Sequence, residues 1–133
     1  MADLNPDTEF LAVDMVIRSK ESLAVLREVW DWAQTRDNRP TKSPRWLLIT
    51  SRDPELTADR ALQAAINRVN RLPAAARRCW DRATTRTFDI GIQCGLRPPN
   101  FEKVVLREKT LRSLNQIGGQ VLVTIYAPYR EDK

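Results

Sequence analysis

The chain has 133 residues and a formal net charge of +5, from 22 Lys and Arg against 17 Asp and Glu. It contains no histidine and two cysteines, which excludes Ser-His-Asp and Cys-His catalysis within the chain and a four-ligand zinc site of the usual kind. We therefore expect no metal and no cofactor, and the composition favours a protein that is not an enzyme.

The length fits a single α/β domain over residues 1–133, with flexible ends at residues 1–7 and 128–133. No apolar run approaches the roughly 20 residues that span a bilayer. The opening segment, MADLNPDTEF, lacks the basic and apolar regions of a secretory signal. These features predict a cytoplasmic protein with reduced cysteines and no membrane partner.

Hydrophobic periodicity predicts the elements of the first third. Residues 8–17 alternate as a strand, and residues 19–34 form a helix with Ser19 as its N-cap. A polar loop over 35–44 leads to a short apolar strand over 45–51. The core stripe of the first helix is expected to contain Leu23, Leu26, Trp30 and Ala33.

The middle of the chain predicts two helices in succession. The first covers residues 52–73, with Thr57 or Asp53 as its cap. Pro73 interrupts the pattern, and a short additional helix is expected over 74–83.

The last third predicts a strand, a helix and a final strand. The strand is 87–94, the helix is 106–117, and the closing strand is 120–126. Gly118 follows the helix and supplies the left-handed residue that a helix end favours. The apolar stripe of this helix is Leu111, Leu114 and Ile117.

The element order predicts an α+β fold, a two-layer sandwich with a four-stranded antiparallel or mixed sheet and three to four helices. Its outline is ferredoxin-like, because the helices have narrow apolar faces and are too few to cover both faces of the sheet. The strand order does not follow from the pattern.

The segments FDIGIQ and LREKTLRSLNQIGGQVLVTIY, within residues 87–126, resemble the end of an uncharacterised bacterial family, a domain of unknown function. The matching positions are Leu111, Leu114, Gly118 and Tyr126, and Trp46 matches a strand tryptophan in the middle of that family. The resemblance implies a small bacterial α/β domain without assigned chemistry. Some such domains look like toxin-neutralising or regulatory partners, an analogy of fold alone.

Charge is spread unevenly along the chain. Residues 1–59 hold 8 basic and 11 acidic residues, whereas residues 60–133 hold 14 basic and 6 acidic ones. The excess is concentrated in residues 60–86, where seven arginines accompany Asp81 alone. Such a bias points to an acidic protein partner, with nucleic acid as an alternative and a solvated helix face as the plainest explanation. The candidate binding residues are Arg60, Arg68, Arg71, Arg77, Arg78, Trp80 and Arg82.

The tryptophans add to this binding hypothesis. Trp30 belongs to the core stripe, whereas Trp32 lies at the edge of that stripe and Trp80 lies among arginines. Tryptophan and arginine are enriched at interaction hot spots. The alternative is that these large rings close the layer between sheet and helices.

Cys94 is the candidate nucleophile. A nucleophile elbow has glycine two residues before and two residues after the nucleophile, whereas Gly91 is three residues before Cys94 and Gly95 directly follows it. Strand alternation instead predicts a buried structural cysteine on the core face. Arg97 is the nearest cation that could activate the thiol.

Asp14 and Asp89 both fall within predicted strands, and two carboxylates on adjacent strands could form an acid/base pair. The sequence therefore leaves three functions open. The first is a protein-interaction or regulatory domain, with an immunity-like role as one form. The second is nucleic-acid binding through residues 60–86, and the third is an enzyme that uses Asp14 and Asp89 or Cys94.

Overall fold

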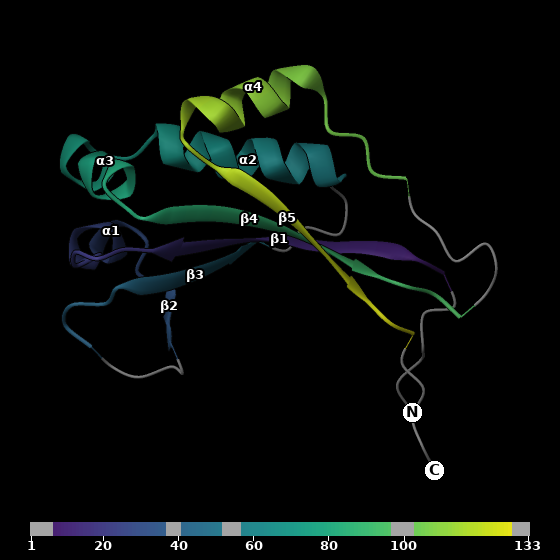
Figure 1. Ribbon diagram of the computed structural model, residues 1–133, viewed down its shortest axis with the longest axis horizontal. Helices are drawn as coiled ribbons and strands as arrows, with labels where there is room; N and C mark the ends of the chain where they lie inside the picture. The colour runs from purple at the N-terminus through teal and green to yellow at the C-terminus, as the bar shows by residue number, and fades with distance from the viewer. Residues whose placement is uncertain (1–6, 37–40, 52–56, 97–102, 129–133) are drawn as a thin grey trace, which may run out of the picture.

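The structure is a computed structural model that describes residues 7–36, 41–51, 57–96 and 103–128. The elements in chain order are β1 (Glu9–Arg18), α1 (Ala24–Val29), β2 (Gln34–Thr35), β3 (Trp46–Ser51), α2 (Ala58–Asn70), α3 (Ala74–Asp81), β4 (Thr85–Gln93), α4 (Glu108–Gln116) and β5 (Gln120–Tyr126) (Figure 1). The expected flexible ends lie almost wholly outside the described residues.

The strands form one mixed sheet in the order β2-β3-β1-β4-β5. β1 is antiparallel to both β3 and β4, and β5 pairs with β4 in parallel. Helices α2 and α4 lie against one face of the sheet, and no helix of the described residues lies against the other (Figure 1). The expected two-layer α+β fold is confirmed, with five strands in place of four.

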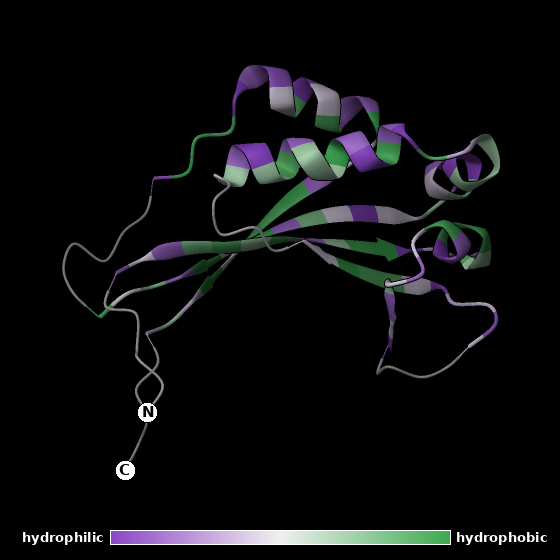
Figure 2. Ribbon diagram, turned by 180° about the vertical axis from the view of Figure 1, so that it is seen from behind, coloured by the Kyte–Doolittle hydropathy of each residue, from purple (hydrophilic) through white to green (hydrophobic). Residues whose placement is uncertain are grey.

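The core lies between the helices and one face of the sheet. Figure 2 shows long hydrophobic stretches in the strands, and mixed hydrophobic and hydrophilic segments along α2 and α4. This banding is typical of a helix with one apolar side. The strand residues that point into the core include Val13, Met15, Ile17, Leu47, Ile49, Phe88, Ile90 and Ile92.

A β-bulge in β1 changes which residues face the core. Phe10 pairs with Ile92 and Ala12 pairs with Gly91, so Leu11 is the extra residue. The bulge shifts the alternation by one place. Phe10 therefore packs against the core. Leu11 lies exposed on the face of the sheet that no described helix covers, called the open face below. Simple alternation predicts the reverse.

The first helix is much shorter than expected. The backbone amides of Ser19 and Leu23 donate to the carbonyls of Arg45 and Pro44, which holds residues 19–23 against the segment before β3. Ser19 accordingly does not cap α1, which begins at Ala24. The predicted core stripe of Leu23, Leu26, Trp30 and Ala33 is nevertheless buried in full.

The later helix ends follow the sequence more closely. Thr57 caps α2, its hydroxyl accepting from the Arg60 amide at 3.2 Å. Gly118 has φ of 70°, the left-handed conformation expected after α4. A Cβ on Gly119 would lie 2.5 Å from Leu114 Cδ1 and 2.7 Å from Phe88 Cε2. A glycine there lets the end of α4 pack tightly against β4.

Candidate functional site

The predicted arginine segment does not form one patch. Arg60 is in the first turn of α2 and Arg71 is its C-cap, so about 16 Å of helix separates them at 1.5 Å per residue. Arg77, Arg78 and Arg82 belong to the separate helix α3 or its C-cap. Arg60, Arg71, Arg78 and Arg82 are exposed. Their binding role stays a prediction.

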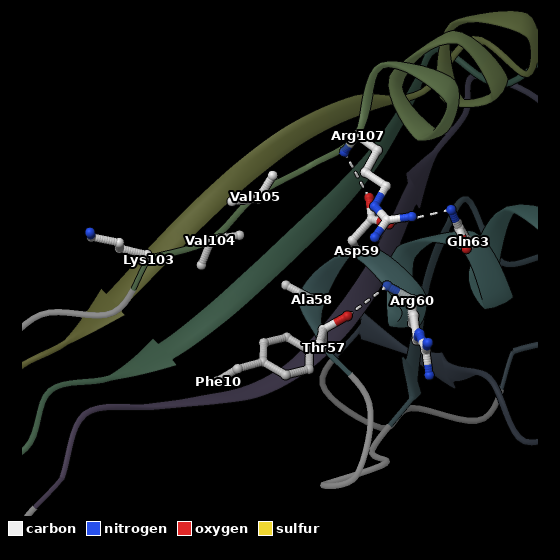
Figure 3. A pocket seen from close by; sticks show the side chains of 10 residues that line it. All are labelled: Phe10, Thr57, Ala58, Asp59, Arg60, Gln63, Lys103, Val104, Val105 and Arg107. Atoms are coloured by element: carbon white, nitrogen blue, oxygen red, sulfur yellow. Dashed lines mark hydrogen bonds between the residues drawn. The ribbon is translucent and has the colours of Figure 1, made fainter.

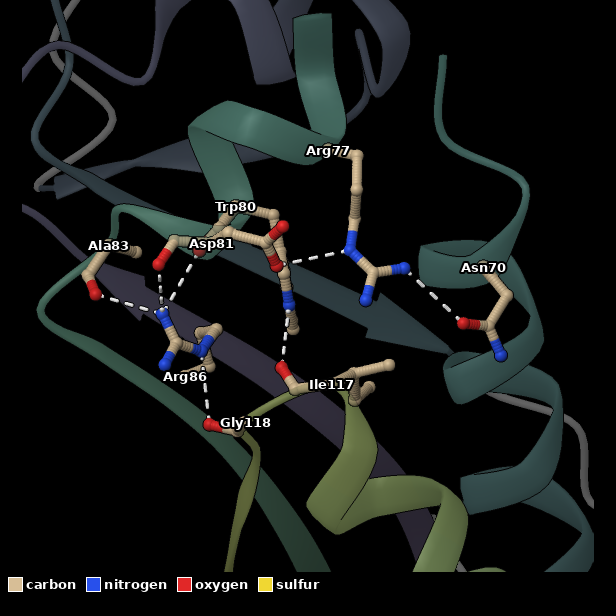
Figure 4. Close-up of polar contacts among 8 residues, drawn as sticks. All are labelled: Asn70, Arg77, Trp80, Asp81, Ala83, Arg86, Ile117 and Gly118. Carbon is tan, nitrogen blue, oxygen red and sulfur yellow. Dashed lines mark hydrogen bonds and ion pairs between the residues drawn. The ribbon is translucent and has the colours of Figure 1, made fainter. Parts of the chain in front are cut away.

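Three residues of the segment hold the fold together around the end of α3 (Figure 4). The Arg86 guanidinium donates to the carbonyls of Trp80 at 3.0 Å, Ala83 at 2.8 Å and Gly118 at 3.0 Å. Arg77 pairs with Asp81 at 3.1 Å within α3. The Arg86 hydrogen bonds join the end of α3 to the turn before β5. The role of this side chain is therefore structural.

Trp80 lies in the core, with 0% of its surface exposed. Its ring packs edge-on against Trp30 and Phe88, each with centroids 6.1 Å away, and its Nε1 donates to the Ile117 carbonyl at 2.9 Å. Trp80 therefore closes the layer between sheet and helices, and its ring is not available to a partner on the surface.

Trp32 is the exposed tryptophan of the pair that the sequence singled out, at 51% exposure. The Arg68 guanidinium lies 5.7 Å from the centroid of its ring and also donates to Ser51 Oγ at 2.7 Å. The cation–π contact joins α2 to the turn between α1 and β2, and the hydrogen bond joins α2 to the end of β3. Of the predicted binding residues, Arg68 is the one that the structure places against an exposed aromatic ring.

A pocket of about 850 Å³ lies where α2 begins, between Phe10 and the extended segment before α4 (Figure 3). Arg60, Lys103 and Arg107 supply its positive charge. The buried Asp59 accepts from the Arg107 amide at 2.9 Å and from Gln63 Nε2 at 3.3 Å. That carboxylate is occupied in fastening residues 103–107 to α2, and it is the one acidic group among the described residues of the lining.

A second pocket, of about 520 Å³, lies near the end of β1 and the start of β3, and none of its arginines belongs to residues 60–86. Arg18, Arg36 and Arg45 line it together with Trp46. The other described residues that line it are Ser, Thr and Pro, with no acidic residue among them. Guanidinium groups beside an indole suit a phosphate attached to a planar ring.

The two cysteines lie in different surroundings. Cys94 follows the end of β4, where its amide donates to the Tyr126 carbonyl at 2.9 Å, and it is partly exposed rather than fully buried. Arg97 lies outside the described residues. Cys79 contacts the Ser22 carbonyl at 3.6 Å, and burial raises the pKa of its thiol, which disfavours the reactive thiolate.

Asp14 and Asp89 are direct cross-strand partners of the β1–β4 pair. Asp89 accepts from the Thr124 hydroxyl at 2.7 Å on the open face of the sheet. The register thus places the two residues opposite each other on adjacent strands, and catalysis by this pair stays a prediction. Within the described residues, no group of three or more His, Cys, Asp or Glu is placed to hold a metal ion.

Sequence reasoning missed the surface around β5. Four large side chains of this strand are between 47% and 64% exposed: Leu122, Val123, Ile125 and Tyr126. β5 is the last strand of the sheet, so one of its sides pairs with no described strand. The sequence carried part of this information, because residues 120–126 contain no charged residue. An exposed edge strand usually carries charges, so an uncharged strand is expected to be covered.

No protein-family model, curated protein or solved structure matches the chain. The resemblance of residues 87–126 to a bacterial family, and the immunity-like role that it suggests, therefore stay predictions. No helix among the described residues is long and apolar enough to cross a membrane.

Proposed function

We propose that this chain is a non-enzymatic protein-interaction domain that binds its partner along β5. The observation that carries the proposal is an uncharged edge strand with four large apolar side chains about half exposed. Edge strands of monomeric proteins are commonly guarded by lysine, proline, a bulge or a covering segment. Within β5 there is no lysine and no proline, so the strand is suited to receive a partner strand.

The chemistry of the remaining surface supports binding rather than catalysis. The chain has no histidine, burial disfavours the Cys79 thiolate, and Asp59 is bonded within the fold. Arg60, Arg71, Arg78 and Arg82 add an exposed positive charge that suits an acidic region of the partner.

The proposal is tested by comparing partners recovered with the wild-type chain and with Val123→Lys. Val123 lies in the middle of β5 and is 48% exposed, and Val25→Lys on α1, at 43%, is the matched control. The partner should be identified, purified and rebound to the pure chain. We expect Val123→Lys to lose it and Val25→Lys to retain it. Equal binding by all three chains would show that β5 is not the binding surface.

Nucleic-acid binding is a second candidate, favoured by the pocket of Arg18, Arg36, Arg45 and Trp46. Binding to phosphates should weaken steeply with salt. A labelled single-stranded oligonucleotide should then lose affinity when Arg18 and Arg45 are changed to Glu. If the predicted segment is responsible instead, Arg60→Glu with Arg71→Glu should cause the loss. Absence of binding at low salt would remove this candidate.

A further inference from the structure

The outer side of β5 presents backbone groups in a fixed pattern. The Tyr126 carbonyl accepts from the Cys94 amide, so Tyr126 directs its backbone groups toward β4. Backbone groups alternate in direction along a strand. Gln120, Leu122 and Thr124 therefore also bond toward β4, and the N–H and C=O groups of Val121, Val123 and Ile125 point away from the sheet.

This pattern is self-complementary about Val123, the middle residue of β5. If a second β5 runs antiparallel with Val123 opposite its own copy, Val121 falls opposite Ile125 and all seven residues are paired. The outward groups then meet outward groups, which gives about six hydrogen bonds between the strands. On the open face, Leu122 falls opposite Thr124 and Gln120 opposite Tyr126. No charged residue is placed opposite another, because β5 contains none.

The helix α4 fits the same symmetry. On the side of α4 next to α2, Thr110 Oγ1 accepts from Gln63 Nε2 at 2.8 Å, and Leu114 faces Phe88 and Gly119. At 100° per residue, Leu111 lies on the side away from α2, toward β5. Leu111 is 44% exposed, although the sequence placed it in the core stripe of this helix. Antiparallel edge pairing requires a two-fold axis perpendicular to the sheet, so the α4 helices of both copies lie on one side and Leu111 approaches its counterpart.

The charge and area of this surface fit a second copy. Glu108 and Arg112 flank Leu111 on α4 and form an ion pair with each other. Their charges offset each other, so this part of α4 does not repel the same part of a second copy. Five large side chains about half exposed offer on the order of 400 Å² of apolar surface, about half of the roughly 800 Å² that each partner gives to a standard interface. The strand backbone and the flanking residues of both faces supply the remainder.

We infer that a second copy of this chain pairs with β5, in the antiparallel register centred on Val123, to form one sheet continuous across two copies. The inference rests on the proposed role of β5 as the binding edge and names its partner. Each copy carries a net charge of +5, so added salt should strengthen the pairing by screening. Salt would instead weaken binding to an acidic partner, which separates the two.

The first test measures the mass of the full chain in solution by light scattering at micromolar concentrations. We expect twice the chain mass of 15.3 kDa for the wild type. Val123→Lys should weaken self-association on the order of 100-fold, because it removes two apolar side chains from the interface and places two lysines opposite each other in an uncharged strand pair. Val25→Lys should keep the dimer. A wild-type monomer, or a dimer unaffected by Val123→Lys, would overturn the inference.

The second test reads the register, in a background with Cys79 and Cys94 changed to Ala. Val123→Cys should form a disulfide with its own copy under a mild oxidant, because opposed Cα atoms lie about 5.5 Å apart. Leu122→Cys alone should not, since its copies are diagonal neighbours at about 7–8 Å. A mixture of Leu122→Cys and Thr124→Cys should cross-link. Cross-linking of Leu122→Cys with itself but not of Val123→Cys would contradict this register.

The outcomes also separate this inference from the proposed function. If the wild type is monomeric and yet loses an identified partner on Val123→Lys, the dimer is wrong and the interaction role of β5 stands. If the wild type is monomeric and Val123→Lys loses nothing, both fail.

Discussion

At the β3 side of the sheet, Arg68 donates to Ser51 at 2.7 Å and lies over Trp32, and the short strand β2 pairs with Leu47 and Leu48. At the β5 side, seven uncharged residues pair with β4, and no strand of the described residues pairs with their other side. A charged, hydrogen-bonded side chain keeps other strands away, whereas a neutral apolar edge admits them. We therefore expect association with another strand to be disfavoured at the β3 side of the sheet and favoured at β5.

The largest effect should come from the core residue that connects both sides. Trp80 contacts Trp30 near the β3 side and bonds the Ile117 carbonyl before β5. Trp80→Ala should lower the free energy of unfolding by about 3–5 kcal/mol, measured by urea denaturation. Trp32→Ala, at an exposed ring, should cost less than about 1 kcal/mol. Similar losses for the two variants would contradict the placement of Trp80 in the core.

A smaller effect is expected where α4 meets β5. Gly119→Ala would bring a Cβ within 2.5 Å of Leu114 Cδ1 and should cost about 1–3 kcal/mol of unfolding free energy through overpacking. The control is Gly91→Ala, whose Cβ would first meet Tyr126 Cε2 at 3.6 Å, an ordinary contact. A calorimetric melting temperature lowered only by the Gly119 change would support this geometry. Equal shifts would argue against it.

Removal of the Arg68 side chain, which bonds the last residue of β3, should have a modest cost. Arg68→Ala loses the Ser51 hydrogen bond and the cation–π contact, together worth about 1 kcal/mol at this partly exposed site. Arg71→Ala, at an exposed arginine on the same helix, should be nearly neutral. Self-association should be unchanged in both, because neither residue touches β5. If Arg68→Ala abolished the dimer, the division between the two edges would be wrong.

The smallest effect concerns the open face between the edges. Like charges directly opposite each other on neighbouring strands destabilise a sheet, and Asp14 faces Asp89. Asp89→Asn should raise the unfolding free energy by about 0.2–1 kcal/mol, because an amide oxygen can still accept from Thr124. Asp31→Asn, at an exposed residue, serves as control. A loss of stability in Asp89→Asn would mean that the hydrogen bond outweighs the repulsion.

Local signals in the sequence predicted much of this fold. The cap at Thr57, the left-handed Gly118 and the strand over residues 120–126 depend on neighbouring residues and match the structure. The helix over residues 19–34 was predicted too long because its first turn bonds to Arg45 and Pro44. Those contacts come from more than twenty residues away, where periodicity carries no information.

The candidate binding surface was harder to predict. The alternation of residues 120–126 is the same whether a strand lies inside a sheet or at its edge, and strand order depends on pairing across the whole chain. Trp80 was named as a binding residue because arginines surround it in sequence, yet its ring lies in the core. Arg77 is partly exposed, but its guanidinium pairs with Asp81 on the same helix. Residue type indicated binding, but only the fold shows which residues the surface presents.

The most direct test is amide hydrogen exchange of β5 by NMR, as a function of protein concentration. We predict that the amides of Val121, Val123 and Ile125 become protected as concentration rises and exchange faster on dilution. The amides of Leu122 and Thr124, bonded to β4, should exchange slowly throughout. Fast exchange of the three outward amides at every concentration, with or without an identified partner, would contradict the claim that β5 is the binding edge.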